Sequence, residues 1–367
     1  MTELMIVVGT RPEVVKMAPV LRALEGGGQE FVVVHSGQHY DYNLSLQFIE
    51  ELGLAKPDYS LRVKEASPAA QTGRMLIAIE EVVEKEAPKL MLVEGDTNTI
   101  LAGALAALKQ HVPVGHVEAG LRSHDFRMPE EHNRRIVDHV STYLFAPTDS
   151  AGQNLTRENV WGRIYVTGNT VIDAVIQHVA LAEKSSTIMD EIRFSEYALA
   201  TAHRAENVDD HKVLKSFVEV FEEAPIPVVF SVHPRTEKRL RQHHMWERLL
   251  SSGNVQILPS VGYLDFLMLM KNCEMLLTDS GGLQEEVTAP PMRKRVLVLR
   301  ISTERPEAVE AGFARVVGTD KGSILRAISE DLEEKKRVPL KSPYGNGDAG
   351  HRIAQIVKNE LARKAKT

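Results

Sequence analysis

The sequence predicts an α/β fold: two Rossmann-like domains, each a doubly wound parallel sheet, that face a central cleft. The chain has 367 residues, a length that suits two domains of roughly 100–200 residues each. Short apolar or β-branched runs alternate with stretches of helical spacing, the pattern of a parallel sheet with crossover helices. This scheme occurs in the first half of the chain and again in the second.

In the first half, the opening apolar run is followed by a helix. Val14, Met17, Leu21 and Leu24 recur at helical spacing after the first strand. The expected strands, with helical stretches between most of them, are Leu4–Val8, Phe31–His35, Lys89–Val93, Val112–His116 and Tyr143–Ala146.

The second half repeats the order of strand and helix. Its expected strands are Tyr197–Ala200, Pro227–Val232, Val255–Leu258, Met275–Thr278 and Val296–Leu299. The halves share an architecture and no short-period repeat.

The domain boundary is expected between Val166 and Ile192, where a strand-like run, a helical stretch and a polar segment follow one another. We therefore expect an N-terminal domain over residues 1–170 and a C-terminal domain over residues 171–345. Residues 346–367 are expected to form an amphipathic helix that packs back on the first domain. Its inward residues would be Ile353, Ile356 and Leu361.

Composition excludes several classes of protein. The net charge of −6 argues against a nucleic-acid binder, which usually carries a basic excess. Cys273 is the one cysteine, so an internal disulfide and a Cys-rich metal site are excluded, and a buried thiol is expected. The N-terminus lacks a signal pattern, and no apolar run approaches the ~20 residues of a membrane span. We expect a cytoplasmic protein without membrane contact.

Ligands of doubly wound folds bind beyond the carboxyl ends of the strands. The first strand is followed by Gly9-Thr-Arg-Pro-Glu13, which places Arg11 and Lys16 near a helix N-terminus, a natural anion site. An ordinary turn with solvated charges is the alternative. The segment has no G-x-G-x-x-G, so the dinucleotide fingerprint is absent.

Acidic residues follow the next strands. In Glu94-Gly-Asp-Thr-Asn98, Asp96 is suited to a site and also to capping the following helix. His116 and Glu118 alternate around Val117, so they would share a face if extended. Next comes the ionisable segment Pro129-Glu-Glu-His-Asn-Arg-Arg135. No fixed zinc spacing occurs here, so we expect no metal and no cofactor.

The second domain supplies a phosphate site. His203 follows its first strand and His233 its second. In Thr278-Asp-Ser-Gly-Gly-Leu-Gln-Glu-Glu286, the Ser280-Gly281-Gly282 turn offers backbone N–H groups at a helix start, which suits phosphate. Glu286, about a turn further on, suits a ribose diol. For Tyr263 and Phe266, core packing and contact with a base are both open readings.

Taken together, these segments resemble the non-hydrolysing UDP-N-acetylglucosamine 2-epimerase family, which has the GT-B fold. They occur in the family's order over nearly the whole chain. The matching segments are Gly9–Glu13, Gly95–Thr97, His116–Arg122, Pro129–Glu131 with Asn133-Arg134, Val166–Asp173, His203-Arg204, Thr278–Gly282 with Gln284–Glu286, and Thr303–Val309.

The resemblance implies reversible conversion of UDP-N-acetylglucosamine to UDP-N-acetylmannosamine. The route would be anti elimination of UDP to 2-acetamidoglucal and syn re-addition, carried out by a cytoplasmic homodimer. Catalytic positions carried over by the resemblance are Asp96, Glu118, Glu130 and His203. Positions for UDP and sugar are Arg11, Lys16, Glu131, Arg134, Phe266, Ser280, Gly281, Gly282 and Glu286.

Some members of the family also have a regulatory UDP-N-acetylglucosamine site. The resemblance places it near Gln38 and His39, with His233 facing from the other domain. Tyr40-Asp-Tyr42 departs from the bacterial pattern there. A second departure is Thr288–Lys294, where the family usually has a small Gly-containing turn.

Three alternatives share parts of this pattern. A hydrolysing epimerase would release N-acetylmannosamine and UDP. A GT-B glycosyltransferase needs one base and an acceptor groove, and has less use for several carboxylates around one sugar. A non-catalytic sensor would have no use for the ionisable residues.

Overall fold

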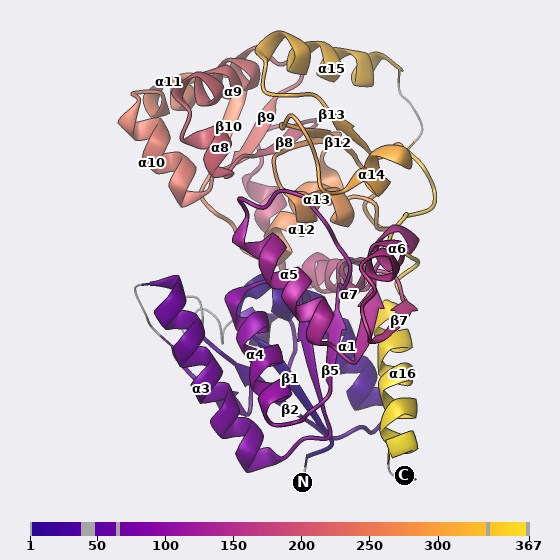
Figure 1. The fold of residues 1–367 in the computed structure, drawn as a ribbon. Helices are drawn as coiled ribbons and strands as arrows, with labels where there is room; N and C mark the ends of the chain where they lie inside the picture. The colour runs from indigo at the N-terminus through magenta and orange to yellow at the C-terminus, as the bar shows by residue number, and fades with distance from the viewer. Residues whose placement is uncertain (1, 38–47, 64–66, 335–337, 365–367) are drawn as a thin grey trace. The chain divides into compact units, whose positions relative to one another are not determined.

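The computed structural model describes residues 2–37, 48–63, 67–334 and 338–364. The chain divides into two compact units. Figure 1 draws the fold with its colour following residue number. Unit 1 comprises Met1–Ala174 and Gly345–Thr367, and unit 2 comprises Val175–Tyr344.

Within its described residues, unit 1 has a seven-stranded parallel sheet in the order β3-β2-β1-β4-β5-β6-β7. The strands are β1 (Leu4–Val8), β2 (Phe31–His35), β3 (Tyr59–Ser60), β4 (Leu90–Glu94), β5 (Val114–Val117), β6 (Tyr143–Ala146) and β7 (Arg163–Val166). The helices are α1 (Arg11–Gly26), α3 (Pro68–Glu86), α4 (Asn98–Lys109), α5 (Pro129–Val140), α6 (Asp149–Arg157) and α16 (Ala349–Lys364). Helix α7 (Thr170–Ser185) begins in unit 1 and ends in unit 2.

Unit 2 has a six-stranded parallel sheet in the order β10-β9-β8-β11-β12-β13, counted over its described residues. The strands are β8 (Ala198–Thr201), β9 (Val228–Ser231), β10 (Val255–Leu258), β11 (Met275–Thr278), β12 (Arg295–Val298) and β13 (Ala314–Val316). The helices are η1 (Ile188–Glu191), α8 (Ala205–Val208), α9 (His211–Glu223), α10 (Pro234–Gln242), α11 (Trp246–Ser251), α12 (Tyr263–Asn272), α13 (Gly281–Glu286), α14 (Pro306–Glu310) and α15 (Lys321–Glu334).

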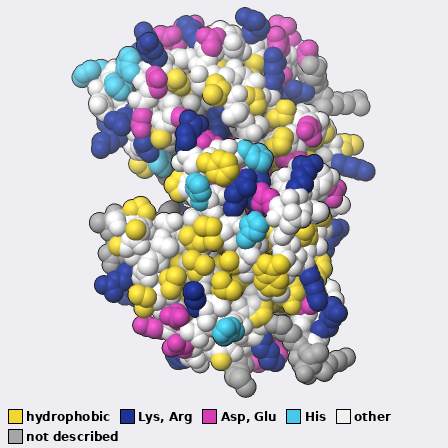
Figure 2. Space-filling model, viewed as in Figure 1, with side chains coloured by type: hydrophobic (Ala, Val, Ile, Leu, Met, Phe, Trp, Pro, Cys, Tyr) yellow, Lys and Arg dark blue, Asp and Glu magenta, His cyan; other side chains and the backbone are white. Residues whose placement is uncertain are grey.

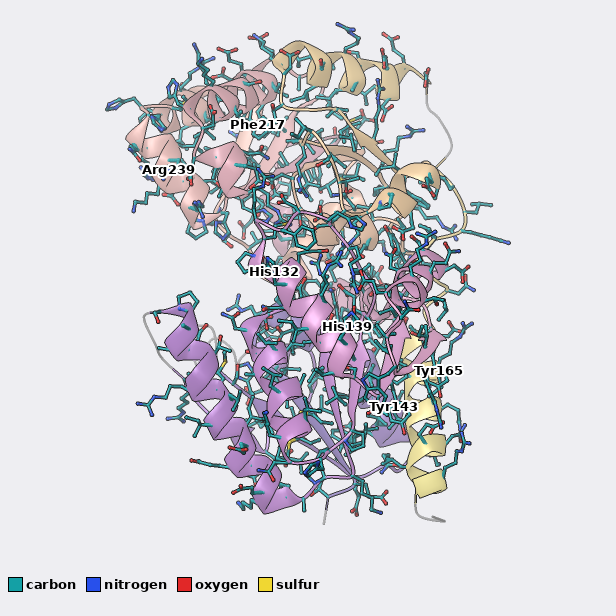
Figure 3. All side chains as sticks on the ribbon, viewed as in Figure 1. His132, His139, Tyr143, Tyr165, Phe217 and Arg239 are labelled. Atoms are coloured by element: carbon teal, nitrogen blue, oxygen red, sulfur yellow. The ribbon has the colours of Figure 1, made fainter. Side chains whose placement is uncertain are left out.

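The sheets form where the sequence predicts them. β1 is a continuous apolar run with all five residues buried, because helices cover both faces of a parallel sheet. Val14, Met17, Leu21 and Leu24 are buried on α1, as their spacing predicts. In unit 2, Phe217 of α9 lies in the core (Figure 3). The predicted α/β class, with two doubly wound parallel sheets, is therefore confirmed.

Two edge strands were not predicted. β3 has two residues and β13 has three, which is too short for a period to be read. The prediction that Ile356 points inward on α16 was also wrong: Ile356 is half-buried, and Val357 is buried instead. The buried face of α16 follows 353, 357 and 361, a spacing of four residues.

Helix α16 packs on α1 within unit 1. A Cβ on Gly350 would lie 2.8 Å from the Pro19 carbonyl carbon, so only glycine allows this approach. Asp173 accepts the N–H groups of Ala349 (3.3 Å) and Gly350 (2.9 Å). Glu360 accepts hydrogen bonds from Arg163 and Tyr165 of β7, and Tyr165 pairs with Phe145 of β6 (Figure 3 labels Tyr165).

Both sheets reverse their strand order at one point. In unit 1 the reversal lies between β1 and β4, and in unit 2 between β8 and β11. The crevice at such a point is the usual ligand position in open parallel sheets. Among the described residues, no helix is both long and apolar enough to cross a membrane.

Candidate active site

The loop after β1 is fixed by one buried carboxyl group. Glu13 accepts the N–H groups of Gly9 (2.5 Å) and Thr10 (3.1 Å), and the hydroxyl of Thr97 (2.6 Å). A Cβ on Gly9 would lie 2.2 Å from Thr99 Oγ1. Glu13 thus joins the loop after β1 to the loop after β4. Burial raises the pKa of Glu13 to about 7, although these hydrogen bonds oppose the rise.

Arg11 and Lys16 occupy different environments on α1. Arg11 is exposed in the first turn, with its guanidinium 5.4 Å from the centre of the Phe48 ring. Lys16 is mostly buried: its Nζ lies 3.3 Å from Glu94 Oε1 and donates to Glu118 Oε2. Lys16 therefore contacts two carboxyl groups of the protein itself, Glu94 and Glu118.

Glu118 stands just beyond β5 in a strained conformation. Its φ of +67° is in the left-handed region, which is uncommon for residues other than glycine and is often found at functional sites. This turn breaks the extended geometry, so His116 and Glu118 do not share a face. The expected shared face required an extended segment, and the left-handed conformation of Glu118 does not meet that condition. Glu118 reaches Lys16, whereas His116 points into the buried interior.

His116 belongs to a buried network that links three segments. Its Nδ1 lies 2.7 Å from Asp138 Oδ1 on α5, and its Nε2 lies 2.8 Å from the Gly95 carbonyl. Asp138 also accepts the N–H of Gly120 (3.2 Å) and pairs with Arg122 (2.7 Å). The loops that carry Asp96 and Glu118 are thereby tied to one helix. Within the described ranges, no group of three His, Cys, Asp or Glu side chains could hold a metal.

Asp96 is held by an arginine. Its Oδ2 lies 2.5 Å from an Arg134 nitrogen, and Arg134 also contacts Glu131 (2.7 Å). The cap of α4 is Thr97, so the alternative of Asp96 as a helix cap is wrong. About a third of the Asp96 side chain is exposed, so a ligand can reach it.

Glu131 and its neighbour Glu130 differ sharply. Glu131 is buried and accepts bonds from Ser123 and Arg135 as well as Arg134. Burial opposes its charge, but these donors lower the pKa of Glu131 to about 2. Glu130 is exposed in the first turn of α5. Glu131 therefore acts as a permanent anion in the frame, and Glu130 faces solvent.

In unit 2, Asp279 organises the loop after β8. Its carboxylate accepts the N–H groups of His203 (3.0 Å) and Arg204 (2.9 Å) and the Asn207 amide (3.0 Å). His203 Nδ1 lies 3.2 Å from the same carboxylate. Burial lowers the pKa of His203, although Asp279 opposes the shift.

The Ser280-Gly281-Gly282 turn begins α13, and Ser280 is its N-cap residue. A Cβ on Gly281 would lie 2.5 Å from Glu304 Oε1, whereas a Cβ on Gly282 would meet no atom within 4 Å. The first N–H groups of a helix have no partner within the helix. Gly282 therefore presents open backbone at the reversal point between β8 and β11.

Glu286 is the last residue of α13, and the two candidate aromatic residues lie on α12. Burial raises the pKa of the Tyr263 phenol well above its usual range, and the negative charge of Glu286 adds to the rise. Phe266 is half-buried, one turn along α12 from Tyr263. These features place the two aromatic residues on the helix that precedes β11.

The residues expected to regulate are only partly described. Gln38 and His39 lie outside the described residues. His233 is the exposed N-cap residue of α10, with its ring centre 5.8 Å from that of His203. In the second departing segment, Arg293 has a φ of +48°, a conformation that favours glycine.

Sequence reasoning noted Glu94 only as an acid at a strand end and gave no role to Asp138 and Asp279. Each of the three contacts other site residues. Asp279 lies in a matched motif, and its position one residue after a strand was an available signal. Asp138 lies seven residues after Glu131, on the same face of α5, and its burial was not readable from the sequence.

Comparisons with known proteins agree with this architecture. Residues 22–358 match the model of a family described as UDP-N-acetylglucosamine 2-epimerase. A protein of that name from Methanocaldococcus jannaschii is 46% identical, covering 97% of this chain and 98% of the relative. A UDP-2,3-diacetamido-2,3-dideoxy-D-glucuronate 2-epimerase from Pseudomonas aeruginosa is 40% identical, covering 97% of this chain and 99% of the relative.

A solved structure is also similar along nearly the whole chain. The M. jannaschii UDP-GlcNAc 2-epimerase in complex with UDP-GlcNAc and UDP has a TM-score of 0.87 and 45% identity. The similarity covers 98% of this chain and 100% of that one. The resemblance read from the motifs is confirmed: the chain belongs to the UDP-N-acetylglucosamine 2-epimerase family.

Proposed function

We propose that this protein interconverts UDP-N-acetylglucosamine and UDP-N-acetylmannosamine without net hydrolysis. The observation that carries the proposal is the similarity to a structure bound to UDP-GlcNAc and UDP, over nearly the whole length of both chains. The fixed carboxyl groups of unit 1 and the open glycine turn of unit 2 are the two kinds of site that the reaction needs.

The chemistry explains why both kinds are needed. The C2 hydrogen of the sugar is not acidic, so loosening the C1–O bond must accompany its removal. Negative charge then gathers on the departing diphosphate, where Arg11, His203 and the Ser280–Gly282 amides are suited to stabilise it. Elimination gives 2-acetamidoglucal, and UDP adds back with C2 inverted.

Inversion calls for more than one proton-transferring group, because the proton leaves one face of the sugar and returns to the other. We propose that Asp96, Glu118 and Glu130 supply these groups. Each stands at the carboxyl end of the unit 1 sheet or on the helix that follows β5. Glu131 and Arg134 hold the sugar side in place, and Phe266 and Glu286 contact the nucleoside.

One experiment separates the candidate reactions. The protein is incubated with UDP-N-acetylglucosamine in D2O and followed by proton NMR. Epimerisation gives UDP-N-acetylmannosamine with deuterium at C2, and hydrolysis gives free N-acetylmannosamine and UDP. A substrate that stays unchanged even at a UDP-N-acetylglucosamine concentration high enough to fill a regulatory site as well contradicts both reactions.

The substrate needs its own test, because a relative at 40% identity is named for a diacetamido glucuronate. The two UDP-sugars are compared by kcat/KM under the same conditions. We expect UDP-N-acetylglucosamine to be preferred, as the name of the 46% identical relative suggests. A preference for the uronate substrate would contradict the proposed specificity.

We also propose that the protein acts as a homodimer. Figure 2 shows hydrophobic side chains gathered on unit 1 over α4 and α5. The exposed large hydrophobic residues of unit 1 include Ile77 on α3, Leu108 on α4 and Ile136 on α5, each more than two-fifths exposed. Large apolar patches often mark protein contacts. Light scattering of the wild type and of Ile136→Asp tests this, and a monomeric wild type contradicts it.

A further inference from the structure

Glu94 is a buried carboxyl group to which the proposed reaction gives no task. It is the last residue of β4, and its side chain is 1% exposed. It precedes the Gly95–Asp96 loop at the reversal point of the unit 1 sheet. A buried carboxyl group in such a position is costly to ionise unless a partner compensates its charge.

The ammonium group beside Glu94 is shared with Glu118. Lys16 Nζ lies 3.3 Å from Glu94 Oε1, and the same Nζ donates to Glu118 Oε2. The ionisable groups that face Glu94 are Lys16 and Glu13 from α1 and Glu118 from the turn after β5. Two carboxyl groups, Glu94 and Glu118, thus share one ammonium group, and Glu13 adds a third carboxyl group that faces Glu94. Like charges this close together are not all ionised at once.

Burial and neighbouring charges decide which of the two carboxyl groups beside Lys16, Glu94 or Glu118, keeps a proton. Burial raises the pKa of Glu94 well above its usual range. Lys16 opposes the rise, and the carboxylates of Glu118 and Glu13 add to it. Glu118 makes the closer contact with Lys16, and its side chain retains 7% exposure. The stronger ion pair therefore falls to Glu118.

We propose that Glu94 is a positioning residue for Glu118: it keeps a proton, leaves Lys16 to Glu118, and so holds Glu118 as a carboxylate ready to accept a proton. This inference rests on the proposed function of Glu118. Glu94 itself touches no reacting atom and exchanges no proton in the cycle. Its neutral carboxyl group supplies a hydrogen-bond donor beside Glu118 without adding a second negative charge.

The first test reads protonation in the resting protein. Infrared difference spectra at neutral pH compare wild type with Glu94→Gln, using the carbonyl stretch of a protonated carboxyl group and its shift in D2O. Glu13→Gln is the matched control, because Glu13 is a second buried carboxyl group with a raised pKa. We expect a band that Glu94→Gln removes and Glu13→Gln leaves. If Glu94→Gln removes no band, the inference is overturned.

The second test uses the pH dependence of kcat/KM. Glu94→Gln keeps a neutral donor, so its acidic limb should match that of wild type, with kcat within about threefold. Glu94→Met keeps the length but removes the donor, so its acidic limb should move to higher pH by about half a unit or more. If the acidic limb of Glu94→Gln moves to lower pH, Glu94 is charged in the wild type. If the acidic limb of Glu94→Met does not move, Glu94 has a merely structural role. Either result overturns the inference.

The outcomes also separate this inference from the proposed function. A wild type that does not epimerise contradicts the function, while the infrared spectra still decide the protonation of Glu94. A wild type that epimerises, with both Glu94 variants indistinguishable from it at every pH, contradicts the inference alone. If Glu94→Met does not fold, Glu94→Gln carries both measurements.

Discussion

At the carboxyl edge of each sheet a buried carboxyl group holds the backbone of one loop, Glu13 in unit 1 and Asp279 in unit 2, but the other site residues are held differently. In unit 1, ionisable side chains contact one another: Lys16 contacts Glu118, Arg134 contacts Asp96, and Asp138 contacts His116. In unit 2, the Asp279 carboxylate holds the backbone N–H groups of the His203 loop, and a glycine turn leaves backbone exposed.

The difference fits two kinds of task. A group that transfers protons must be ionisable, and its charge state is set by neighbouring charges and by burial. A site for diphosphate needs many fixed donors, which backbone N–H groups supply without changing their protonation. The comparison predicts that changes in unit 1 alter turnover and pH dependence, whereas changes in unit 2 alter UDP affinity.

Asp96→Asn should have the largest effect. The amide keeps the size and removes the ionisable group, so kcat should fall by about 10²–10⁴-fold, the usual contribution of a general acid or base. The dissociation constant for UDP, measured by calorimetry, should stay within about threefold of wild type. A large loss of UDP affinity with modest change in kcat would move Asp96 from chemistry to binding and break the comparison.

Glu13 should make stability depend on pH. Its folded pKa of about 7 lies above the ordinary value of 4.5, so the stability it contributes is complete below pH 4.5 and is lost as pH rises through 7. The rise of about 2.5 units corresponds to about 3 kcal/mol. Urea unfolding of wild type and Glu13→Gln should therefore show a difference that changes over this pH window. A difference independent of pH would contradict the assignment.

Gly282→Ala should separate binding from folding in unit 2. Its added Cβ meets no protein atom, so the free protein should melt at the same temperature or slightly higher. If the diphosphate packs on this turn, UDP affinity should fall by about tenfold, the value of one charged hydrogen bond. Gly281→Ala is the matched contrast: its Cβ meets Glu304, so the free protein should be destabilised. Unchanged UDP affinity in Gly282→Ala would place the ligand elsewhere.

Glu360→Gln should have the smallest effect and should touch neither site. Glu360 on α16 pairs with Arg163 of β7, whose side chain is half-exposed, so solvent screens the interaction. The expected loss of stability is about 1 kcal/mol or less. Thermal unfolding measures it, with UDP affinity and kcat unchanged. A large loss of kcat would show that the C-terminal helix acts on the edge of the unit 1 sheet.

Most of the fold follows from local pattern. Strands buried on both faces must be apolar throughout, and the helices between them must carry an apolar stripe, so both leave a period in the sequence. β3 and β13 left none because they are two and three residues long. On α16 the spacing of 353, 356 and 361 and the spacing of 353, 357 and 361 both fit an apolar stripe, and only packing on α1 selects the second.

The types of residue in the site could be predicted from the sequence, but the contacts between them could be predicted less well. Asp96, Glu118 and His203 follow strands, so their place at a sheet edge could be inferred. The partners that hold them are distant in sequence: Lys16 is 102 residues from Glu118. The left-handed turn at Glu118 also had no signal, because nothing in its residue type favours that conformation.

The way α16 closes unit 1 bears on the order of events during synthesis. Asp173 can accept the N–H groups of Ala349 and Gly350, and α1 can pack against Gly350, only after these two residues have left the ribosome. Unit 2 is one continuous segment, Val175–Tyr344, and is complete before then. Domains generally fold as units, and usually from the N-terminus onward. In this chain the second unit to be synthesised is the first that can finish folding, and unit 1 must wait with an uncovered face on α1.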